Sequence, residues 1–199
     1  MHSFPNNISK DDVNLLSLGH YTGEIELIEN EQDEAVALED INQSIYVGFD
    51  TESKPAFKKG TYNPIALIQI ATVKKTYLFR INKYGLSEEM KTLLGNEKVG
   101  KIGIGLNEDL RDLSKLGVEK ISGFIHLNEI VKEIDIESNG LRKLTAIILG
   151  FRVSKSAQVS NWEARKLSRK QILYAATDAW VCLEMYQKLI DLNLIKHSE

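Results

Sequence analysis

The sequence predicts an α/β protein built on a mixed β-sheet flanked by helices. Apolar, strand-like runs follow one another closely in the first half of the chain, and later runs alternate with helical patterns. A length of 199 residues and a hydrophobic content of 43% fit one globular domain with a substantial core. We expect a polar tail and a short helix over residues 1–20, followed by a single domain over residues 21–195.

Most of the strands are expected in the first half of the chain, where β-branched and aromatic residues cluster. The predicted strands of this half span residues 21–28, 45–52, 65–72 and 76–81. Because only a short turn at Lys74 and Lys75 separates the last two, they should pair as an antiparallel hairpin. One helix should begin after a Ser9 cap and stop at Gly19, and a second is predicted over residues 35–41.

The second half should alternate helices with short strands. Helices are predicted over residues 86–94, 107–116, 128–134 and 141–149, and strands over residues 98–104 and 121–127. Ser168 should cap a long final helix, because apolar residues recur at every third or fourth position as far as Tyr186.

Composition and charge exclude several classes of protein. A net charge of −3 means that any nucleic-acid contact must come from a local basic patch. The single cysteine, Cys182, excludes an intrachain disulfide and lies in an apolar stretch, so we expect a buried structural thiol. No apolar run approaches ~20 residues, and the first residues lack the features of a signal peptide. We therefore expect no membrane contact and a cytoplasmic protein.

Two acids stand at the end of the central predicted strand. Asp50 and Glu52 are spaced i and i+2, so their side chains project from the same face. Neighbouring carboxylates repel one another, and a divalent cation such as Mg²⁺ removes that repulsion. The alternative is that the strand simply ends here and that water solvates both acids.

A third acid, Asp109, lies in the first turn of a predicted helix that follows a strand. Sites in α/β proteins form at the carboxyl ends of strands, which favours a functional role for Asp109. The alternative is an ordinary favourable interaction between an acid and the helix dipole.

The last helix carries a tyrosine and an acid within an apolar stretch. Tyr174 and Asp178 are four residues apart and share one face of the helix. A buried acid requires a metal or a basic partner, so the alternative is that Asp178 forms an ion pair and that Tyr174 is a core aromatic.

The four acids together would suit a two-metal site. Such a site activates a water molecule and stabilises the leaving oxygen of a phosphoryl displacement. Tyr174, with an unperturbed pKa of ~10, would orient the water rather than deprotonate it.

The motifs resemble those of the DEDD superfamily of 3′–5′ exonucleases, which have an RNase H-like fold. The matching motifs are Phe49-Asp50-Thr51-Glu52, the stretch from Lys101 to Asp109, and Tyr174-Ala175-Ala176-Thr177-Asp178. A tyrosine four residues before the last aspartate fits the tyrosine (DEDDy) branch. The segments 66–71 and 160–162 are similar to those of the group that includes the Werner syndrome helicase exonuclease domain.

The resemblance implies hydrolysis of phosphodiester bonds at the 3′ end of DNA or RNA, with release of nucleoside 5′-monophosphates and with two Mg²⁺ or Mn²⁺ ions. It implies that the metal ligands are Asp50, Glu52, Asp109 and Asp178, and that Leu106 and Asn107 help to line the terminal-nucleotide pocket. Two alternatives remain at this point: a module that binds nucleic-acid 3′ ends without cutting, and a phosphodiesterase that acts on small nucleotides. The sequence identifies no protein partner.

A basic stretch precedes the last helix and is a candidate substrate contact. Its cations are Arg152, Lys155, Arg165, Lys166, Arg169 and Lys170, and Lys54, Lys58 and Lys59 follow the first acid pair. The alternative is a solvated loop surface. Trp162 would either stack on a base or plug the core.

Overall fold

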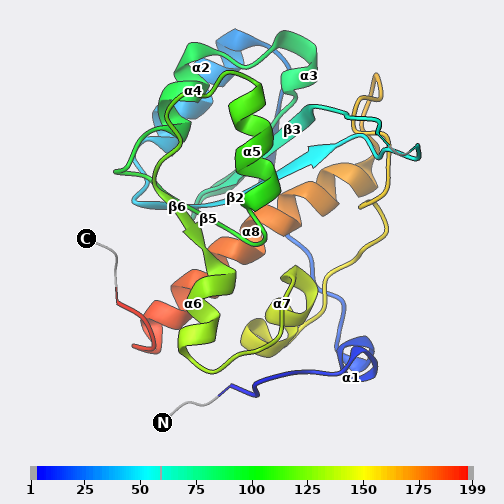
Figure 1. Cartoon of the computed structure of the whole chain (residues 1–199), viewed down its shortest axis with the longest axis vertical. Coiled ribbons are helices and arrows are strands. Elements are labelled where there is room, and N and C mark those ends of the chain that lie inside the picture. Colours follow the sequence, from blue (N-terminus) through cyan, green and yellow to red (C-terminus); the bar gives the residue numbers. More distant parts are fainter. Residues whose placement is uncertain (1–3, 59, 197–199) are drawn as a thin grey trace.

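The computed structural model describes residues 4–58 and 60–196, and it confirms the α/β class. A six-stranded sheet with the order β1-β4-β3-β2-β5-β6 runs through the middle of the molecule, with helices on both faces (Figure 1). The strands are β1 (Glu24–Ile28), β2 (Tyr46–Ser53), β3 (Ile65–Ala71), β4 (Lys75–Phe79), β5 (Gly100–Gly103) and β6 (Phe124–His126).

The sheet is mixed, as predicted. Strands β2, β3 and β4 form an antiparallel meander, which includes the predicted hairpin of β3 and β4. The outer strands run parallel to their neighbours: β1 to β4, β5 to β2 and β6 to β5. Because β2 and β5 are parallel neighbours, the carboxyl end of β2 lies beside the loop that connects β5 to the next helix.

The helices also follow the prediction, with shifts of a few residues at their ends. They are α1 (Lys10–Leu15), α2 (Glu31–Ile41), α3 (Ile81–Tyr84), α4 (Glu88–Leu94), α5 (Asn107–Lys115), α6 (Leu127–Glu133), α7 (Leu141–Leu149) and α8 (Arg169–Asp191). The short α3 was not expected: Ile81 was predicted to end a strand, and residues 82–84 were assigned to no element. Within the described residues, no helix is both long and apolar enough to cross a membrane.

Each face of the sheet has its own layer of helices. Helices α2, α4 and α5 pack on the face that carries Val47 and Phe49 of β2. Helices α6, α7 and α8 pack together on the opposite face, which carries Ile102 of β5 (Figure 1). Strand residues alternate between faces, so Gly48, Asp50 and Glu52 of β2 project toward the layer that contains α8.

Helix α8 lies directly on β2 because glycine occupies position 48. A Cβ atom at Gly48 would stand 1.9 Å from the carbonyl oxygen of Ala179, which is far too close. The neighbouring residues of α8, Ala175, Ala176 and Ala179, are small and fully buried. These small residues bring the helix backbone against the strand and place Asp178 beside the carboxyl end of β2.

The start of α8 is fixed by its cap and by a buried arginine. Ser168 and Gln171 form a capping box, as the Ser168 cap predicted. Arg80 is fully buried, and its guanidinium donates hydrogen bonds to the carbonyls of Ala164 and Arg165 and to Glu29. The connection that leads into α8 is therefore anchored to the sheet.

The first described residues, expected to be a loose tail, are instead attached to the domain. The carbonyl of Asn6 accepts a hydrogen bond of 2.8 Å from the amide of Glu137. Ser17 and Gly19 pair with the main chain of Arg152 at 3.0 and 2.9 Å. Helix α1 is capped by Ser9, as predicted, but ends at Leu15 rather than at Gly19.

We predict that Gly48→Ala destabilises the protein by about 3 kcal/mol, because the added methyl group must displace the backbone of α8. Thermal unfolding would measure the change. Ile45→Ala is the matched control: Ile45 precedes the same strand, is 70% exposed, and should change stability by less than about 0.5 kcal/mol. Equal melting temperatures for Gly48→Ala and the wild type would contradict the close helix–strand contact.

Candidate active site

Three carboxylates from two distant parts of the chain meet at the end of β2. One carboxylate oxygen from each of Asp50, Glu52 and Asp178 lies within 4.8 Å of the other two. Strand alternation places the first two on one face, and the close approach of α8 brings the third. Asp178 is only 5% exposed, and its Oδ1 has no hydrogen-bond partner within the described residues.

Burial raises the pKa of all three acids, and neighbouring charges add to this effect for Asp50 and Glu52. Burial and the charges of Asp178 and Glu52 raise the pKa of Asp50 well above its usual value. Burial, with the charges of Asp178 and Asp109, raises the pKa of Glu52 to about 9. Burial also raises the pKa of Asp178. The fold thus concentrates negative charge where solvent cannot screen it.

Asp109, the fourth predicted acid, lies next to this cluster but outside it. Its charge raises the pKa of Asp50 and Glu52, so it stands within electrostatic reach of both. Its Oδ1 accepts a hydrogen bond from the hydroxyl of Thr51, which projects from the other face of β2. The structure therefore brings three of the four predicted acids together and holds the fourth beside them.

Tyr174 lies one turn before Asp178 and faces the same cluster. Burial and the charges of Asp178 and Glu52 raise the pKa of its hydroxyl, so the phenol stays protonated and can donate a hydrogen bond. The ring of Trp162 packs against it, with the ring centroids 6.1 Å apart. Trp162 is fully buried, which excludes base stacking and favours the alternative of a core plug.

The acids open into a cavity of about 690 Å³, within the range of ordinary ligand sites. Asp50, Glu52, Asp178 and Tyr174 form part of its wall. The rest of the wall comes mainly from α1, from the turn after β5, from the start of α7 and from residues 153–158, with Thr51 and Asn128.

The residues predicted to line the terminal-nucleotide pocket behave differently from one another. Asn107 is exposed at the start of α5. Leu106 is fully buried, and its side chain fills the space beside Gly103. It belongs to the core, so the expectation that Leu106 lines the nucleotide pocket is wrong. Ile104 and Gly105 line the cavity in its place, and the amide of Gly105 donates to Asn128 at 2.7 Å.

The predicted basic contacts do not form one patch. Lys54 forms an exposed ion pair with Glu163 at 3.3 Å, while Arg165 and Lys166 are exposed farther along that connection. Arg152 donates to the carbonyl of Leu16 and has a structural role. Lys155 lines the main cavity, and Lys170 lines a smaller cavity of about 170 Å³ beside Tyr174. Lys59 lies outside the described residues.

Several residues around the cavity were missed by sequence reasoning. Lys10, Arg142 and Lys143 line it, although they lie far from every acidic motif in the chain. A pair of basic residues after Asn139-Gly140 is a weak signal, because such pairs are common on solvated helix surfaces. Only the packing of α1 on α7 reveals their position.

The donor set fits divalent cations. Mg²⁺ and Mn²⁺ prefer carboxylate oxygens, and three such groups converge here without a basic partner among the described residues. The buried, unpaired oxygen of Asp178 is the atom that a cation would satisfy.

The fold and the site define an RNase H-like protein with a carboxylate cluster at the carboxyl end of its central strand. A family model described as 3′-5′ exonuclease matches residues 25–192. The chain belongs to this family of 3′–5′ exonucleases, which is of the DEDD type.

Individual relatives support the same assignment. The chain is 35% identical over 153 residues to the mouse bifunctional 3′-5′ exonuclease/ATP-dependent helicase WRN, covering 74% of this chain and 11% of that protein. It is 30% identical over 166 residues to a 3′-5′ exonuclease of Arabidopsis thaliana, covering 74% and 53%. The chain therefore spans well under two thirds of the length of both relatives.

Solved structures show the same fold. The Nibbler EXO domain of Aedes aegypti superposes with a TM-score of 0.78 at 22% identity, covering 87% of this chain and 94% of that one. Escherichia coli RNase D superposes with a TM-score of 0.76 at 22% identity, covering 84% and 44%.

We predict that the metal-free protein loses stability as the pH rises from 6 to 9. Glu52 has a pKa of about 9 in the folded state against 4.5 ordinarily, so between pH 6 and 9 the folded state binds more protons than the unfolded state. The free energy of unfolding therefore falls as the pH rises. In a chelator, the melting temperature should fall by about 4 °C or more.

Two comparisons check this result. Glu52→Gln, which removes the titrating group, should flatten the fall, and added Mg²⁺ should reduce it in the wild type. A melting temperature that rises with pH in the chelator would show that the carboxylates do not repel one another.

Proposed function

We propose that this chain removes nucleoside 5′-monophosphates from the 3′ end of a nucleic acid by a two-metal mechanism. The observation that carries the proposal is the convergence of Asp50, Glu52 and Asp178 within 4.8 Å at one wall of a cavity of about 690 Å³. Family membership supplies the reaction class, and the cluster supplies the donor set that this reaction requires.

The acids would hold two Mg²⁺ or Mn²⁺ ions. Asp50, Glu52 and Asp178 would be the ligands that the cluster supplies. Asp109 would complete the set, since it stands beside the cluster on its Thr51 hydrogen bond. When bound, the two cations supply an activated water and stabilise the leaving oxygen.

Tyr174 would orient the attacking water, as expected if the chain is of the tyrosine branch of the family. Its hydroxyl is a donor in the same cavity as the acids. Trp162 packs on the ring and holds it in place. Tyr174 would therefore be a catalytic residue and Trp162 a positioning residue.

The substrate class that fits is a strand with a free 3′ end. Among the relatives, WRN is named as both exonuclease and helicase, and RNase D as an exoribonuclease. Matched DNA and RNA strands, each labelled at the 5′ end and incubated with Mg²⁺, would test cleavage and reveal the preferred sugar. Tight binding without shortening of either strand would favour a non-cleaving module.

We predict that Asp178→Asn lowers cleavage at least about 1,000-fold, because a metal supplies several kcal/mol of transition-state stabilisation. The variant should fold, since it removes a charge from a repulsive cluster. Glu184→Gln, on an exposed position of the same helix, is the matched control and should cleave normally. Asp50→Ala should abolish cleavage in the same way. Substantial activity in the Asp178→Asn or the Asp50→Ala protein would refute the metal-ligand assignment.

We predict that Tyr174→Phe lowers kcat by about 10- to 100-fold, because the variant loses only the donor that orients water. The Mg²⁺-induced rise in melting temperature should persist. Tyr84→Phe is the matched control: among the described residues its buried hydroxyl has no hydrogen-bond partner, and it lies on α3, away from the cavity. Loss of the Mg²⁺ effect in Tyr174→Phe would show that this tyrosine has a structural role instead.

A further inference from the structure

The N-terminal segment, residues 4–20, lies before the region that the family model matches, which begins at residue 25. It nevertheless borders both cavities next to the acids. Lys10 and Val13 of α1 line the larger cavity, and Leu18 and His20 line the smaller one beside Tyr174 and Asp178. The segment therefore contributes to the walls of the candidate active site.

The segment is fixed in this position along its length. Asn7 Oδ1 accepts a hydrogen bond from Lys143 Nζ at 3.0 Å. Asn14 Oδ1 accepts one from Arg142 Nη2 at 2.6 Å, which ties α1 to the start of α7. The pairing of Ser17 and Gly19 with Arg152 holds its other end. Because of these contacts, the segment has a fixed position and forms part of the cavity wall.

The larger cavity carries opposite charges on its walls. The acids come from β2 and α8, whereas the cations come from α1, α7 and residues 153–158. We call these cations the basic wall: Lys10, Arg142, Lys143 and Lys155.

The basic wall is not used to neutralise the acids. Among the described residues, no ion pair joins a member of the basic wall to Asp50, Glu52 or Asp178. The ammonium groups of Lys10 and Lys155 make no hydrogen bond or ion pair within that part of the chain. Unpaired cations in a cavity attract anions.

We propose that the basic wall binds the backbone phosphates of the nucleotides that precede the 3′-terminal one. This inference rests on the proposed function and deepens it, because it names the ligand as a strand of several nucleotides. A single strand carries one negative charge per nucleotide, so a phosphate at the acids implies others farther along the cavity. The acids would receive the scissile phosphate with its cations, and the basic wall would position the rest of the strand.

The test measures binding rather than cleavage, on the full-length chain. Asp178→Asn serves as the background, so that the strand is not shortened. Fluorescence anisotropy would follow 12-nucleotide DNA and RNA strands of one sequence, labelled at the 5′ end, over a range of salt concentrations.

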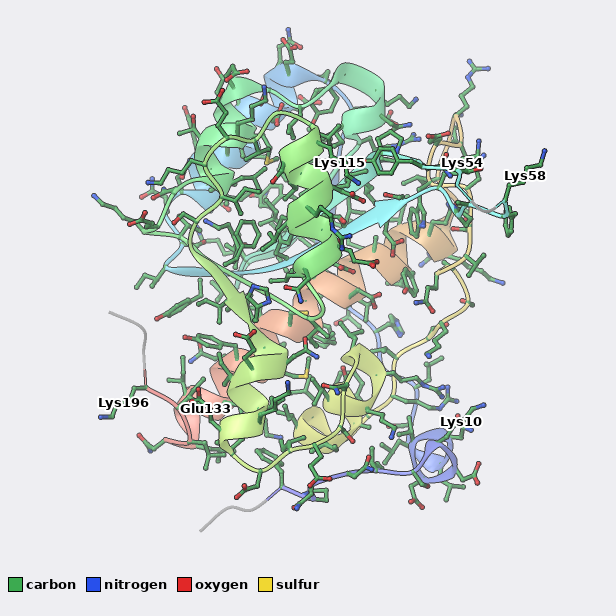
Figure 2. All side chains as sticks on the ribbon, viewed as in Figure 1. Lys10, Lys54, Lys58, Lys115, Glu133 and Lys196 are labelled. Carbon is green, nitrogen blue, oxygen red and sulfur yellow. The ribbon has the colours of Figure 1, made fainter. Side chains whose placement is uncertain are left out.

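Lys10→Gln with Lys155→Gln should raise Kd about tenfold and reduce the slope of log K against log salt by about two. The matched control is Lys98→Gln with Lys196→Gln, which removes two exposed charges away from the cavity and should leave Kd and slope unchanged. Lys10 and Lys196 lie on opposite sides of the molecule (Figure 2). If the double variant loses affinity for only one of the two strands, DNA or RNA, the result supports phosphate binding by the basic wall for that nucleic acid.

A Kd within twofold of the background for both strands, with an unchanged salt slope, would overturn the inference. An equal loss of affinity in the control variant would also overturn the inference, because the net charge of the protein would then explain the weaker binding. Anisotropy does not depend on cutting, so a wild type without nuclease activity would refute the proposed function and leave the binding result intact.

Discussion

The close contact between α8 and β2 is the constraint on which the rest of the site depends. Gly48 leaves room for the carbonyl of Ala179, and three buried alanines let the helix settle onto the strand. Asp178 follows directly from that contact, because it precedes Ala179 in the same helix. Asp50 and Glu52 follow from strand alternation two and four residues beyond Gly48. A single residue without a side chain thus brings together acids that lie 128 positions apart in the sequence.

The carboxylate cluster lowers the stability of the metal-free fold. The three carboxylates have no basic partner in the part of the chain that the structure describes, so they repel one another, and burial strengthens that repulsion. The surrounding structure holds them in place by other means: the capping box of α8, the Arg80 anchor to the connection before it, and the tight packing at Gly48. A divalent cation would reverse the sign of the interaction, so the same geometry that is unfavourable alone becomes favourable with metal.

Much of this was readable from the sequence, because local patterns determined it. Alternation predicted that Asp50 and Glu52 share a face, and the four-residue spacing placed Tyr174 and Asp178 together. The remainder depended on tertiary packing. Leu106 looked like a pocket residue but folds over Gly103, and Trp162 fills the core beneath Tyr174. The hydrogen bond between Thr51 and Asp109 depends on the rotamers of both side chains, which no sequence pattern specifies. Lys10 and Lys155 line the same cavity, although no pattern in the sequence links them.

The distance along the chain between the acids has a consequence for biosynthesis. Asp50 leaves the ribosome long before Asp178, and the sheet needs β5 and β6 before α8 has a complete surface to pack against. A chain without α8 therefore holds two of the three clustered acids and cannot assemble the site. Under the proposed function, the chain would therefore stay inert during its own translation, when the nearest nucleic acid is the message and the ribosome that produce it. Activity would begin only once the last helix has closed the fold.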